Sequence, residues 1–247
     1  MAPGVNARNV KRLDGKVVAI TGASSGIGRG LAERFGAEGA CVVLGARQSG
    51  PLEAVATAIQ QAGGRALAVP MDVRREEDIV RFVEAAVAGF GRLDVFVNNA
   101  GIGVWKRVED TTLAELHAVL RTNLYGTFLG SREAFKHMRA HGGGTILNIS
   151  SMAGKDAWEG TGVYSASKFG IQGLSRALSD EGRAHGVRVT CICPGMVDTP
   201  LIASEDVARR EELIAVADVA EAAIYLATLA PNVMVQELLL ERKLADS

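Results

Sequence analysis

The stretch 16–28, which reads KVVAITGASSGIG, decides the fold of this chain. A continuously apolar run with β-branched residues, typical of a buried strand, leads directly into a glycine-rich turn and then into a helical pattern. Gly22 permits a tight bend, Gly26 lets the backbone approach a pyrophosphate, and Gly28 permits close packing of helix on strand. Exposed N–H groups at the helix start would then face the phosphates. The residues that we expect to contact a dinucleotide here are Gly22, Ser24, Ser25, Gly26, Ile27 and Gly28.

The same alternation of short apolar runs and amphipathic stretches continues along the chain. Six further runs lie at residues 41–46, 66–71, 94–98, 145–149, 188–193 and 233–240. Because they are continuously apolar, we expect strands that are buried on both faces. Helical patterns separate them, which predicts βαβ units and parallel strands. The sequence therefore predicts an α/β fold, a Rossmann-type doubly wound parallel sheet of seven strands with helices on both faces.

The domain organisation follows from the same pattern. The chain contains no internal repeat and no low-complexity linker, so we predict a single domain over residues 13–247. Residues 1–12 carry no apolar pattern and are expected to form a mobile extension. The longest helices are predicted at 113–138, 163–185 and 219–229.

Composition excludes several classes of function. The 27 basic residues are balanced by 28 acidic ones, so the basic excess of a nucleic-acid binder is missing. No run of about 18 apolar residues and no signal peptide is present, and we expect a cytoplasmic protein without a membrane partner. Three cysteines argue against a disulfide framework. Cys191 and Cys193 are either a metal pair or neighbours on one face of a buried strand; we favour the strand and expect no metal, because no ligand cluster lies near them in the sequence.

The second strand indicates which nicotinamide cofactor fits. An NAD enzyme usually carries Asp or Glu about 20 residues after the turn, where it binds the ribose 2′-hydroxyl. Here the stretch Leu44–Gln48 contains no acid, and Arg47 stands in its place. An arginine pairs well with a 2′-phosphate through charge-assisted hydrogen bonds, although it is also an ordinary solvated loop residue. We expect NADP(H), with NAD(H) the less favoured cofactor.

Tyr164 and Lys168 form the expected reacting pair. They stand four residues apart in a predicted helix and so project from one face. Ser151 follows the apolar run 145–149, at the carboxyl edge of the sheet. A carbonyl that receives a hydride becomes an alkoxide and needs a proton, which a tyrosine can donate. A nearby ammonium stabilises the phenolate that the reverse reaction needs, and a serine hydroxyl stabilises charge on the substrate oxygen.

Asn123 lies in the middle of a predicted helix, where asparagine is disfavoured because its side chain competes for backbone hydrogen bonds. A residue that breaks a local rule is often kept for function. The alternative is a helix kink without a chemical role.

These motifs together resemble those of the short-chain dehydrogenase/reductase family, in its compact single-domain branch. Besides the glycine turn, Ser151 and the pair Tyr164-x3-Lys168, the resemblance rests on Asn98-Asn99-Ala100-Gly101, Asn123, Pro194-Gly195 and Val197-Asp198-Thr199. It covers about residues 13–200. Each motif is common, but their order and spacing are specific.

The resemblance implies roles for these residues. Tyr164 would be the acid/base, Lys168 would also bind the nicotinamide ribose, Ser151 would position the carbonyl, and Asn123 would hold a water in a proton relay. Further cofactor contacts would come from Asp72, Val73, Asn99, Ala100, Gly101, Pro194, Gly195, Val197 and Thr199. The resemblance also implies a homotetramer or dimer, in which the helices at 113–138 and 163–185 pair between subunits.

The substrate pocket is predicted from the residues that lie near the expected reacting set in the sequence. We expect a largely apolar pocket formed by Val104, Trp105, Met152, Trp158 and Met196, each of which is alternatively a core residue. The segment between Thr199 and Val219 is short, which suggests an open pocket.

The predicted function is an NADP(H)-dependent carbonyl reductase or alcohol dehydrogenase for a small, apolar molecule. A second enzyme that shares the motifs is 3-ketoacyl carrier-protein reductase, although such enzymes commonly end in Asp-Gly-Gly and this sequence reads LLLERKLADS there. A nicotinamide-binding sensor without catalysis is the alternative from another class.

Overall fold

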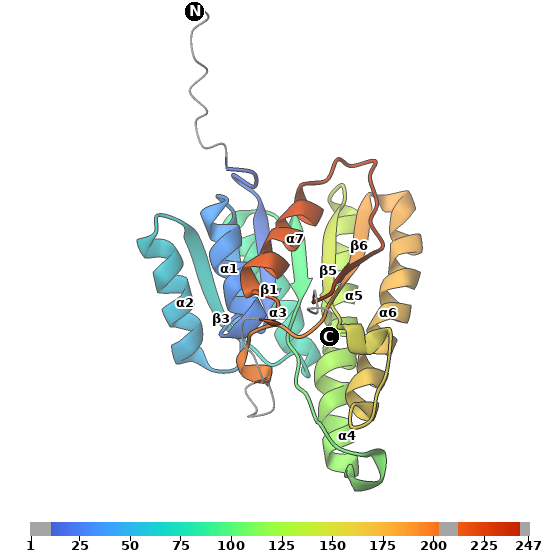
Figure 1. The fold of residues 1–247 in the computed structure, drawn as a ribbon. Helices are drawn as coiled ribbons and strands as arrows, with labels where there is room; N and C mark the ends of the chain where they lie inside the picture. The colour runs from blue at the N-terminus through green and yellow to red at the C-terminus, as the bar shows by residue number, and fades with distance from the viewer. Residues whose placement is uncertain (1–10, 203–211, 243–247) are drawn as a thin grey trace, which may run out of the picture.

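The computed structural model describes residues 11–202 and 212–242. Its centre is a seven-stranded parallel sheet, as the sequence predicted (Figure 1). The strand order is β3-β2-β1-β4-β5-β6-β7. The strands are β1 Val17–Thr21, β2 Cys41–Ala46, β3 Arg65–Pro70, β4 Val95–Asn98, β5 Gly144–Ile149, β6 Val187–Pro194 and β7 Glu237–Leu240.

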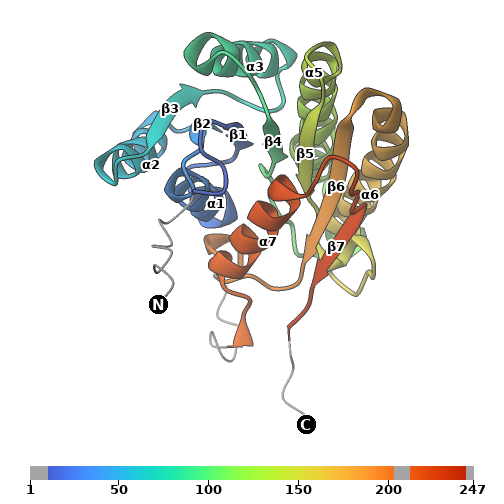
Figure 2. The same cartoon turned by 90° about the horizontal axis from the view of Figure 1, so that it is seen from above.

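Helices cover both faces of the sheet. They are α1 Gly26–Ala37, α2 Ser49–Gln61, α3 Glu76–Phe90, α4 Leu113–Val119, α5 Gly126–Ala140, α6 Gly162–Gly182 and α7 Val216–Thr228. Figure 2 shows α1, α2 and α7 on one face and α3, α5 and α6 on the other. Each face carries its own core: Leu31 and Ile224 pack against one side of the central strands, and Phe82 and Leu129 against the other. This two-sided burial explains the continuously apolar strands.

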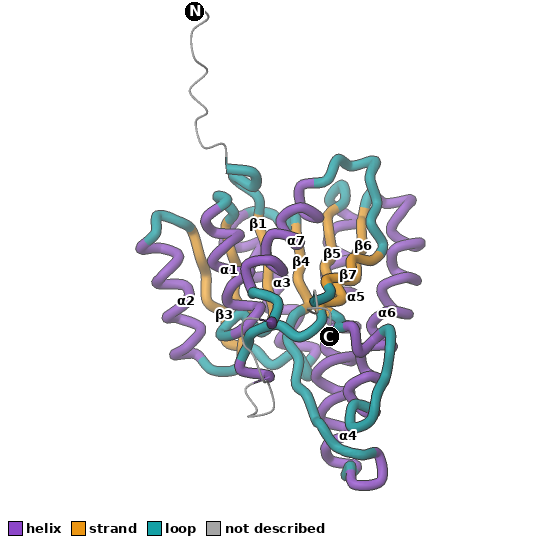
Figure 3. Tube along the Cα trace, viewed as in Figure 1, coloured by secondary structure: helices purple, strands orange, loops and turns teal. Residues whose placement is uncertain are grey.

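The strand order reverses between β1 and β4, because β1 continues to β2 on one side and β4 continues to β5 on the other. In open α/β sheets ligands bind at this point, beyond the carboxyl ends of the strands. Figure 3 shows the connecting loops gathered along that edge, where α4 also lies.

The long helix expected at 113–138 differs from an ideal α-helix. Thr112 caps α4 with a reciprocal capping box to Glu115, and the helix then passes through a π-helical stretch, η2 Leu120–Tyr125, before α5. The stretch contains Asn123, whose carbonyl accepts a hydrogen bond from the Thr127 hydroxyl at 2.7 Å. The expected irregularity at this asparagine is therefore a widened helical turn, a feature frequent at functional sites.

Other boundaries shift by a few residues. The strand predicted from residue 233 begins at Glu237. Before it, the Val235 carbonyl accepts its hydrogen bond from the Thr190 side chain, whereas a regular strand would pair it with a backbone N–H group. Arg12, which the sequence assigned to the extension, forms ion pairs with Glu38 and Glu221 and so contacts the domain. Residues 1–10 lie outside the described part. Within residues 11–202 and 212–242, no helix is long and apolar enough to cross a membrane.

Candidate active site

The glycine turn after β1 is as tight as its sequence requires. Gly22 has a φ of +67°, and a Cβ there would lie 2.8 Å from the Cα of Ala100. A Cβ on Gly28 would lie 2.2 Å from the Gly22 carbonyl oxygen, so helix α1 can pack on β1 only with glycine at this position. Ser25 precedes α1 without capping it through its side chain, which leaves the first N–H groups of the helix available to a ligand.

Buried polar groups fix the turn to the neighbouring strand. The Thr21 hydroxyl accepts hydrogen bonds from the backbone N–H groups of Asn99 and Ala100, at 3.0 and 3.2 Å. The Asn99 amide donates to the carbonyls of Thr21 and Gly22, at 3.0 and 3.2 Å. Two strands that are adjacent across the switch point are thus joined at their carboxyl ends, and the glycine turn is fixed to the end of β4.

A cavity of about 770 Å³ extends from this turn to helix α6. It is bordered by most of the residues that the sequence assigned to a cofactor or a substrate: Gly22, Ser24, Ser25, Gly26, Ile27, Arg47, Asp72, Val73, Asn99, Ala100, Gly101, Trp105, Ser151, Met152, Trp158, Tyr164, Lys168, Pro194, Gly195, Met196, Val197 and Thr199. Gly28, Asn123 and Val104 do not border it. Gly28 packs behind the turn, in the close helix-on-strand contact that the sequence predicted, and its contact with a ligand stays a prediction.

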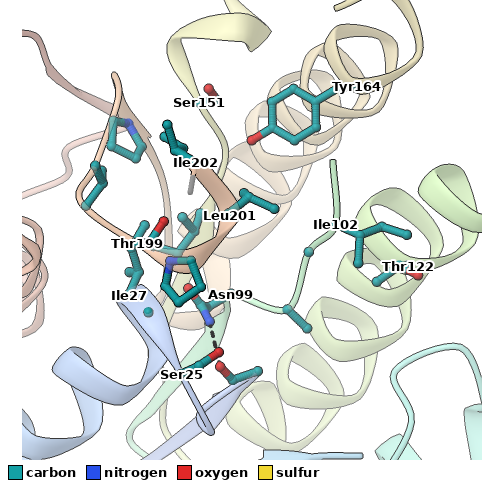
Figure 4. Close-up of a pocket in the computed structure, with 18 of the residues that line it drawn as sticks. Ser25, Ile27, Asn99, Ile102, Thr122, Ser151, Tyr164, Thr199, Leu201 and Ile202 are labelled. Carbon is teal, nitrogen blue, oxygen red and sulfur yellow. Dashed lines mark hydrogen bonds between the residues drawn. The ribbon is translucent and has the colours of Figure 1, made fainter. Parts of the chain in front are cut away.

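Tyr164 and Lys168 lie one helical turn apart in α6 and are both buried. The Lys168 ammonium lies 5.5 Å from the centre of the Tyr164 ring and donates to the Ile149 carbonyl at 2.9 Å. In Figure 4 the Tyr164 hydroxyl points into the cavity that Ser151, Leu201 and Ile202 also border. The helix thus presents a phenol to the cavity with a fixed cation beside it.

Ser151 reaches the cavity from the end of β5. Its hydroxyl oxygen accepts from the Ala153 N–H at 3.1 Å and so caps the short turn η3 Met152–Gly154. The preceding Ser150 donates to the Lys168 carbonyl at 3.1 Å. Gly154 lets this turn approach α6, since a Cβ there would lie 2.9 Å from the same carbonyl oxygen. The serine and the Tyr164–Lys168 helix are therefore held together by direct contacts.

Asn123 is fully buried behind the cavity. Its Oδ1 accepts from the Ile102 N–H at 2.9 Å, and its Nδ2 donates to the Ile102 carbonyl at 2.9 Å and to the Ser167 hydroxyl at 3.1 Å. Ser167 in turn donates to the Tyr164 carbonyl at 2.6 Å. Asn123 therefore joins the loop after β4 to α6 through hydrogen bonds. Both N–H groups of its side-chain amide take part in these bonds.

Apolar side chains form the part of the cavity beyond Tyr164. Trp105 lies with its ring centre 4.8 Å from that of Tyr164, at 57°, and is 49% exposed. Trp158 is 54% exposed, although the backbone around it is fixed by bonds to Thr161. Met152 and Met196 complete the predicted wall, whereas Val104 is half-buried outside it.

Several bordering residues were not identified from the sequence. They include Ile102, Thr122, Arg74, Leu201, Ile202, Glu241 and Arg242. Thr122 and Ile102 were findable from their position beside Asn123 and after β4. Leu201 and Ile202 belong to η5 Pro200–Ile202, within the segment expected to be short; residues 203–211 of that segment lie outside the described part. Val197 and Ile214, which lie on either side of residues 203–211, form an isolated β-bridge.

The end of the cavity near β2 and β3 carries charge. Arg47, Asp72 and Arg74 border it together, from the ends of β2 and β3.

At the opposite side of the sheet, Cys191 and Cys193 are buried on β6 with their sulfurs 4.0 Å apart, which confirms that they share a strand face. Among the described residues, no group of three or more potential ligands could hold a metal.

The known proteins that this chain resembles are dehydrogenases. The family model described as short chain dehydrogenase matches residues 16–210. The chain is 40% identical to 3beta-hydroxysteroid dehydrogenase 1 of Eggerthella lenta, over 87% of this chain and 88% of that protein. It is 37% identical to cis-4-hydroxycyclohexanecarboxylate dehydrogenase of Sinomonas cyclohexanicum, over 91% and 94%.

A solved structure of a metagenomic short-chain oxidoreductase in complex with NADP superimposes with a TM-score of 0.83 at 36% identity, over 95% of this chain and all of that one. The family model covers most of the chain, and the solved relative shares its fold. The chain belongs to the short-chain dehydrogenase/reductase family, whose members are oxidoreductases that act on alcohols.

Proposed function

We propose that this protein is an NADP(H)-dependent oxidoreductase that interconverts a ketone and a secondary alcohol on a small apolar substrate. One observation carries the proposal. Tyr164 and Lys168 lie buried on one face of α6, beside Ser151, and border the same cavity as the glycine turn. A phosphate-binding turn and a proton donor in one cavity are what a hydride-transfer reaction needs.

The proposed roles follow from these positions. A bound nicotinamide would supply or accept the hydride. Tyr164 would hold the proton that the substrate oxygen gains in reduction and loses in oxidation. The Ser151 hydroxyl, kept in place by its cap on η3, would donate to the same oxygen. Lys168 would stabilise the phenolate through its charge. Asn123 would act through position, by holding the Ile102 backbone beside the reacting residues.

The cavity is suited to a phosphorylated dinucleotide. At one end the uncapped start of α1 offers N–H groups to a pyrophosphate. At the adenosine end Arg47 is exposed, borders the cavity and makes no ion pair with any described residue. A free guanidinium there supports NADP(H) as the cofactor. The relative that was solved with NADP adds to this support.

We propose a saturated ring as the substrate skeleton. Trp105, Trp158, Met152 and Ile202 provide flat and flexible apolar surface beyond Tyr164. The two named relatives are, by their names, dehydrogenases of a hydroxysteroid and of a hydroxycyclohexane carboxylate. Both names describe a hydroxyl group on a saturated ring. An aromatic and apolar wall would bind such a skeleton by burying its apolar surface, without requiring many hydrogen bonds.

The test is loss of NADPH absorbance with a panel of ketones. The panel contains cyclohexanones with and without a 4-carboxylate, a 3-ketosteroid, a straight-chain ketone and a 3-ketoacyl thioester, each repeated with NADH. We expect turnover with ring ketones and a preference for NADPH. Preference for the thioester would favour a carrier-protein reductase. Tight binding of NADPH without any turnover would favour a sensor, and preference for NADH would contradict the role of Arg47.

We also propose a homo-oligomer that pairs through α5 and α6. Tyr125, Phe128 and Phe169 lie on this part of the molecule and are each more than 40% exposed. Large exposed aromatic residues on one part of a molecule are typical of an interface. Light scattering should give a dimer or tetramer for the wild type and a smaller species for Phe169→Glu; a monomeric wild type would contradict the proposal.

A further inference from the structure

The two residues that follow β7, Glu241 and Arg242, border the cavity and are not used by the roles proposed above. Arg242 is half-buried, whereas Glu241 is exposed. Within residues 11–202 and 212–242, no group forms a hydrogen bond or an ion pair with the Arg242 guanidinium. A cation that is partly removed from water without a protein partner is unfavourable, and an anionic ligand in the cavity would offset that cost.

The backbone of Arg242 is fixed against the wall of the cavity. The Gly195 N–H donates to the Leu240 carbonyl at 2.8 Å, which joins the end of β6 to the end of β7. A Cβ on Gly195 would lie 3.9 Å from the backbone nitrogen of Arg242. Gly195 itself borders the cavity, directly before Met196 of the apolar wall. Arg242 therefore lies at the substrate end of the cavity.

The strand register relates Arg242 to Ser151. The strands β5, β6 and β7 are neighbours in the sheet, in that order (Figure 2). Ser151 and Arg242 each follow their strand by two residues, and β5 ends level with Ile192 of β6, whereas β7 ends level with Pro194. The two backbones are thus separated by about 10 Å across the sheet and about 7 Å along the strands. A ring ketone that is hydrogen-bonded to Ser151 and the Arg242 side chain can together span this gap.

The other cations that border the cavity are placed for other tasks. The Lys168 ammonium is held by a backbone carbonyl beside the reacting tyrosine. Arg47 and Arg74 lie near the ends of β2 and β3, on the far side of the switch point. Glu241 is exposed, so water and salt screen its charge. Among the described residues of the cavity wall, Arg242 is thus the cation that an acidic group on the substrate would meet.

We propose that Arg242 forms a second polar subsite, which binds a carboxylate on the substrate ring at the end remote from the reacting carbonyl. The substrate class is then a ring oxo acid and the corresponding hydroxy acid. An arginine pairs with a carboxylate through two parallel hydrogen bonds, so the contact would also fix the orientation of the ring. The apolar middle of the ring would lie against the aromatic wall. This inference deepens the proposed function and rests on it, because it needs a ring ketone bound at Ser151 and Tyr164.

The test compares three cyclohexanones that differ only at the carbon opposite the carbonyl, which carries a carboxylate, its methyl ester or a trimethylammonium group. The NADPH-dependent kcat and KM are measured for the wild type and for Arg242→Gln. Lys155→Gln is the matched control, because Lys155 is a cation that pairs with Glu237 of the same strand and does not border the cavity. The dissociation constant of NADPH and the thermal unfolding of each variant are recorded alongside.

We expect the wild type to favour the carboxylate over the methyl ester about tenfold in kcat/KM, as for one charge-assisted interaction, and to use the trimethylammonium ketone least. Arg242→Gln should raise KM for the carboxylate about tenfold. The same variant should leave KM for the ester and the dissociation constant of NADPH within about twofold of the wild type. Lys155→Gln should keep the wild-type preference.

The outcomes separate the inference from the proposed function. If none of the three ketones is reduced, the ring-ketone proposal fails and the inference fails with it. If the ketones are reduced but the carboxylate has no advantage, or the trimethylammonium ketone is preferred, the inference alone is overturned. A preference that Arg242→Gln leaves unchanged would also overturn it. So would a loss shared by the carboxylate and the ester, or weaker binding of NADPH, because Arg242 would then serve the fold or the cofactor.

Discussion

The two ends of the cavity are built in different ways. Around the glycine turn, the Thr21 and Asn99 side chains hydrogen-bond backbone groups and so join β1 to β4, and Gly28 lies against Gly22. Beyond Tyr164, the wall consists of side chains that solvent reaches, with Trp158 54% and Leu201 44% exposed. A change at the first end must move a strand, whereas a change at the second moves one side chain. The first end is thus constrained by the fold, and the second is free to differ between relatives that share one reaction.

The largest effect should come from the constrained end. In Gly28→Ala the new Cβ would lie 2.2 Å from the Gly22 carbonyl oxygen, so the turn and α1 must separate. We expect unfolding to become easier by about 3 kcal/mol, together with loss of cofactor binding. Gly173→Ala is the control: no atom lies within 4 Å of its Cβ, and alanine in a helix should stabilise by about 0.5–1 kcal/mol. Equal behaviour of the two variants in thermal unfolding would contradict the constraint at Gly28.

The second effect concerns the reacting pair. Lys168→Met removes the cation beside the Tyr164 ring and the hydrogen bond to Ile149. We expect kcat to fall about 100-fold or more, since general acid–base catalysis contributes on the order of 10²–10⁴. Lys155→Met is the control, because Lys155 pairs with Glu237 outside the cavity lining. Steady-state kinetics measure the effect. A Lys168 variant with more than half of the wild-type kcat would contradict the proposed role of the lysine in stabilising the phenolate.

The third effect tests the exposed end. Trp158→Ala should leave the unfolding free energy within about 0.5 kcal/mol, since the indole is half exposed. We expect KM for a bulky ring ketone to rise about tenfold while KM for NADPH stays constant, because only apolar area at the substrate is lost. An unchanged KM for every ketone in the panel would place the substrate elsewhere in the cavity.

The smallest effect lies far from the cavity, in the pairing of the N-terminal Arg12 with the domain. Hydrogen bonds from Arg12, and further ones from Arg34, lower the pKa of Glu38 to about 2. Because the folded-state pKa lies below the unfolded value, the stabilisation is present above about pH 4.5 and is lost as the pH falls toward 2. Glu38→Gln should therefore cost about 1 kcal/mol at pH 7, and this difference should shrink below pH 4.5. Acid unfolding curves measure it. Glu33→Gln, which removes an exposed pair with Arg29, should show a smaller change.

The sequence predicted the fold and most of the residues that border the cavity, because their determinants are local. The turn at Gly22–Gly28 and the spacing of Tyr164 and Lys168 are each contained within a few residues. The π-helical turn at Asn123 was visible only as a misplaced asparagine, since its cause is a contact with Ile102 far away in the sequence. Arg74 was missed because no motif marks it, although it borders the same cavity as Arg47. Val104 was placed in the wall by its neighbours, but a side-chain direction in a loop does not follow from sequence order.

The most direct test of the account is the NADPH-dependent reduction of a ring ketone by Tyr164→Phe. Its control is Tyr225→Phe, which removes the same hydroxyl from a residue that is 51% exposed and outside the cavity lining. We predict that kcat falls about 1,000-fold in Tyr164→Phe, while the dissociation constant of NADPH changes less than about threefold and the control keeps wild-type activity. A Tyr164 variant that turns over at a rate near that of the wild type would contradict the assignment of this cavity as a hydride-transfer site with a tyrosine acid.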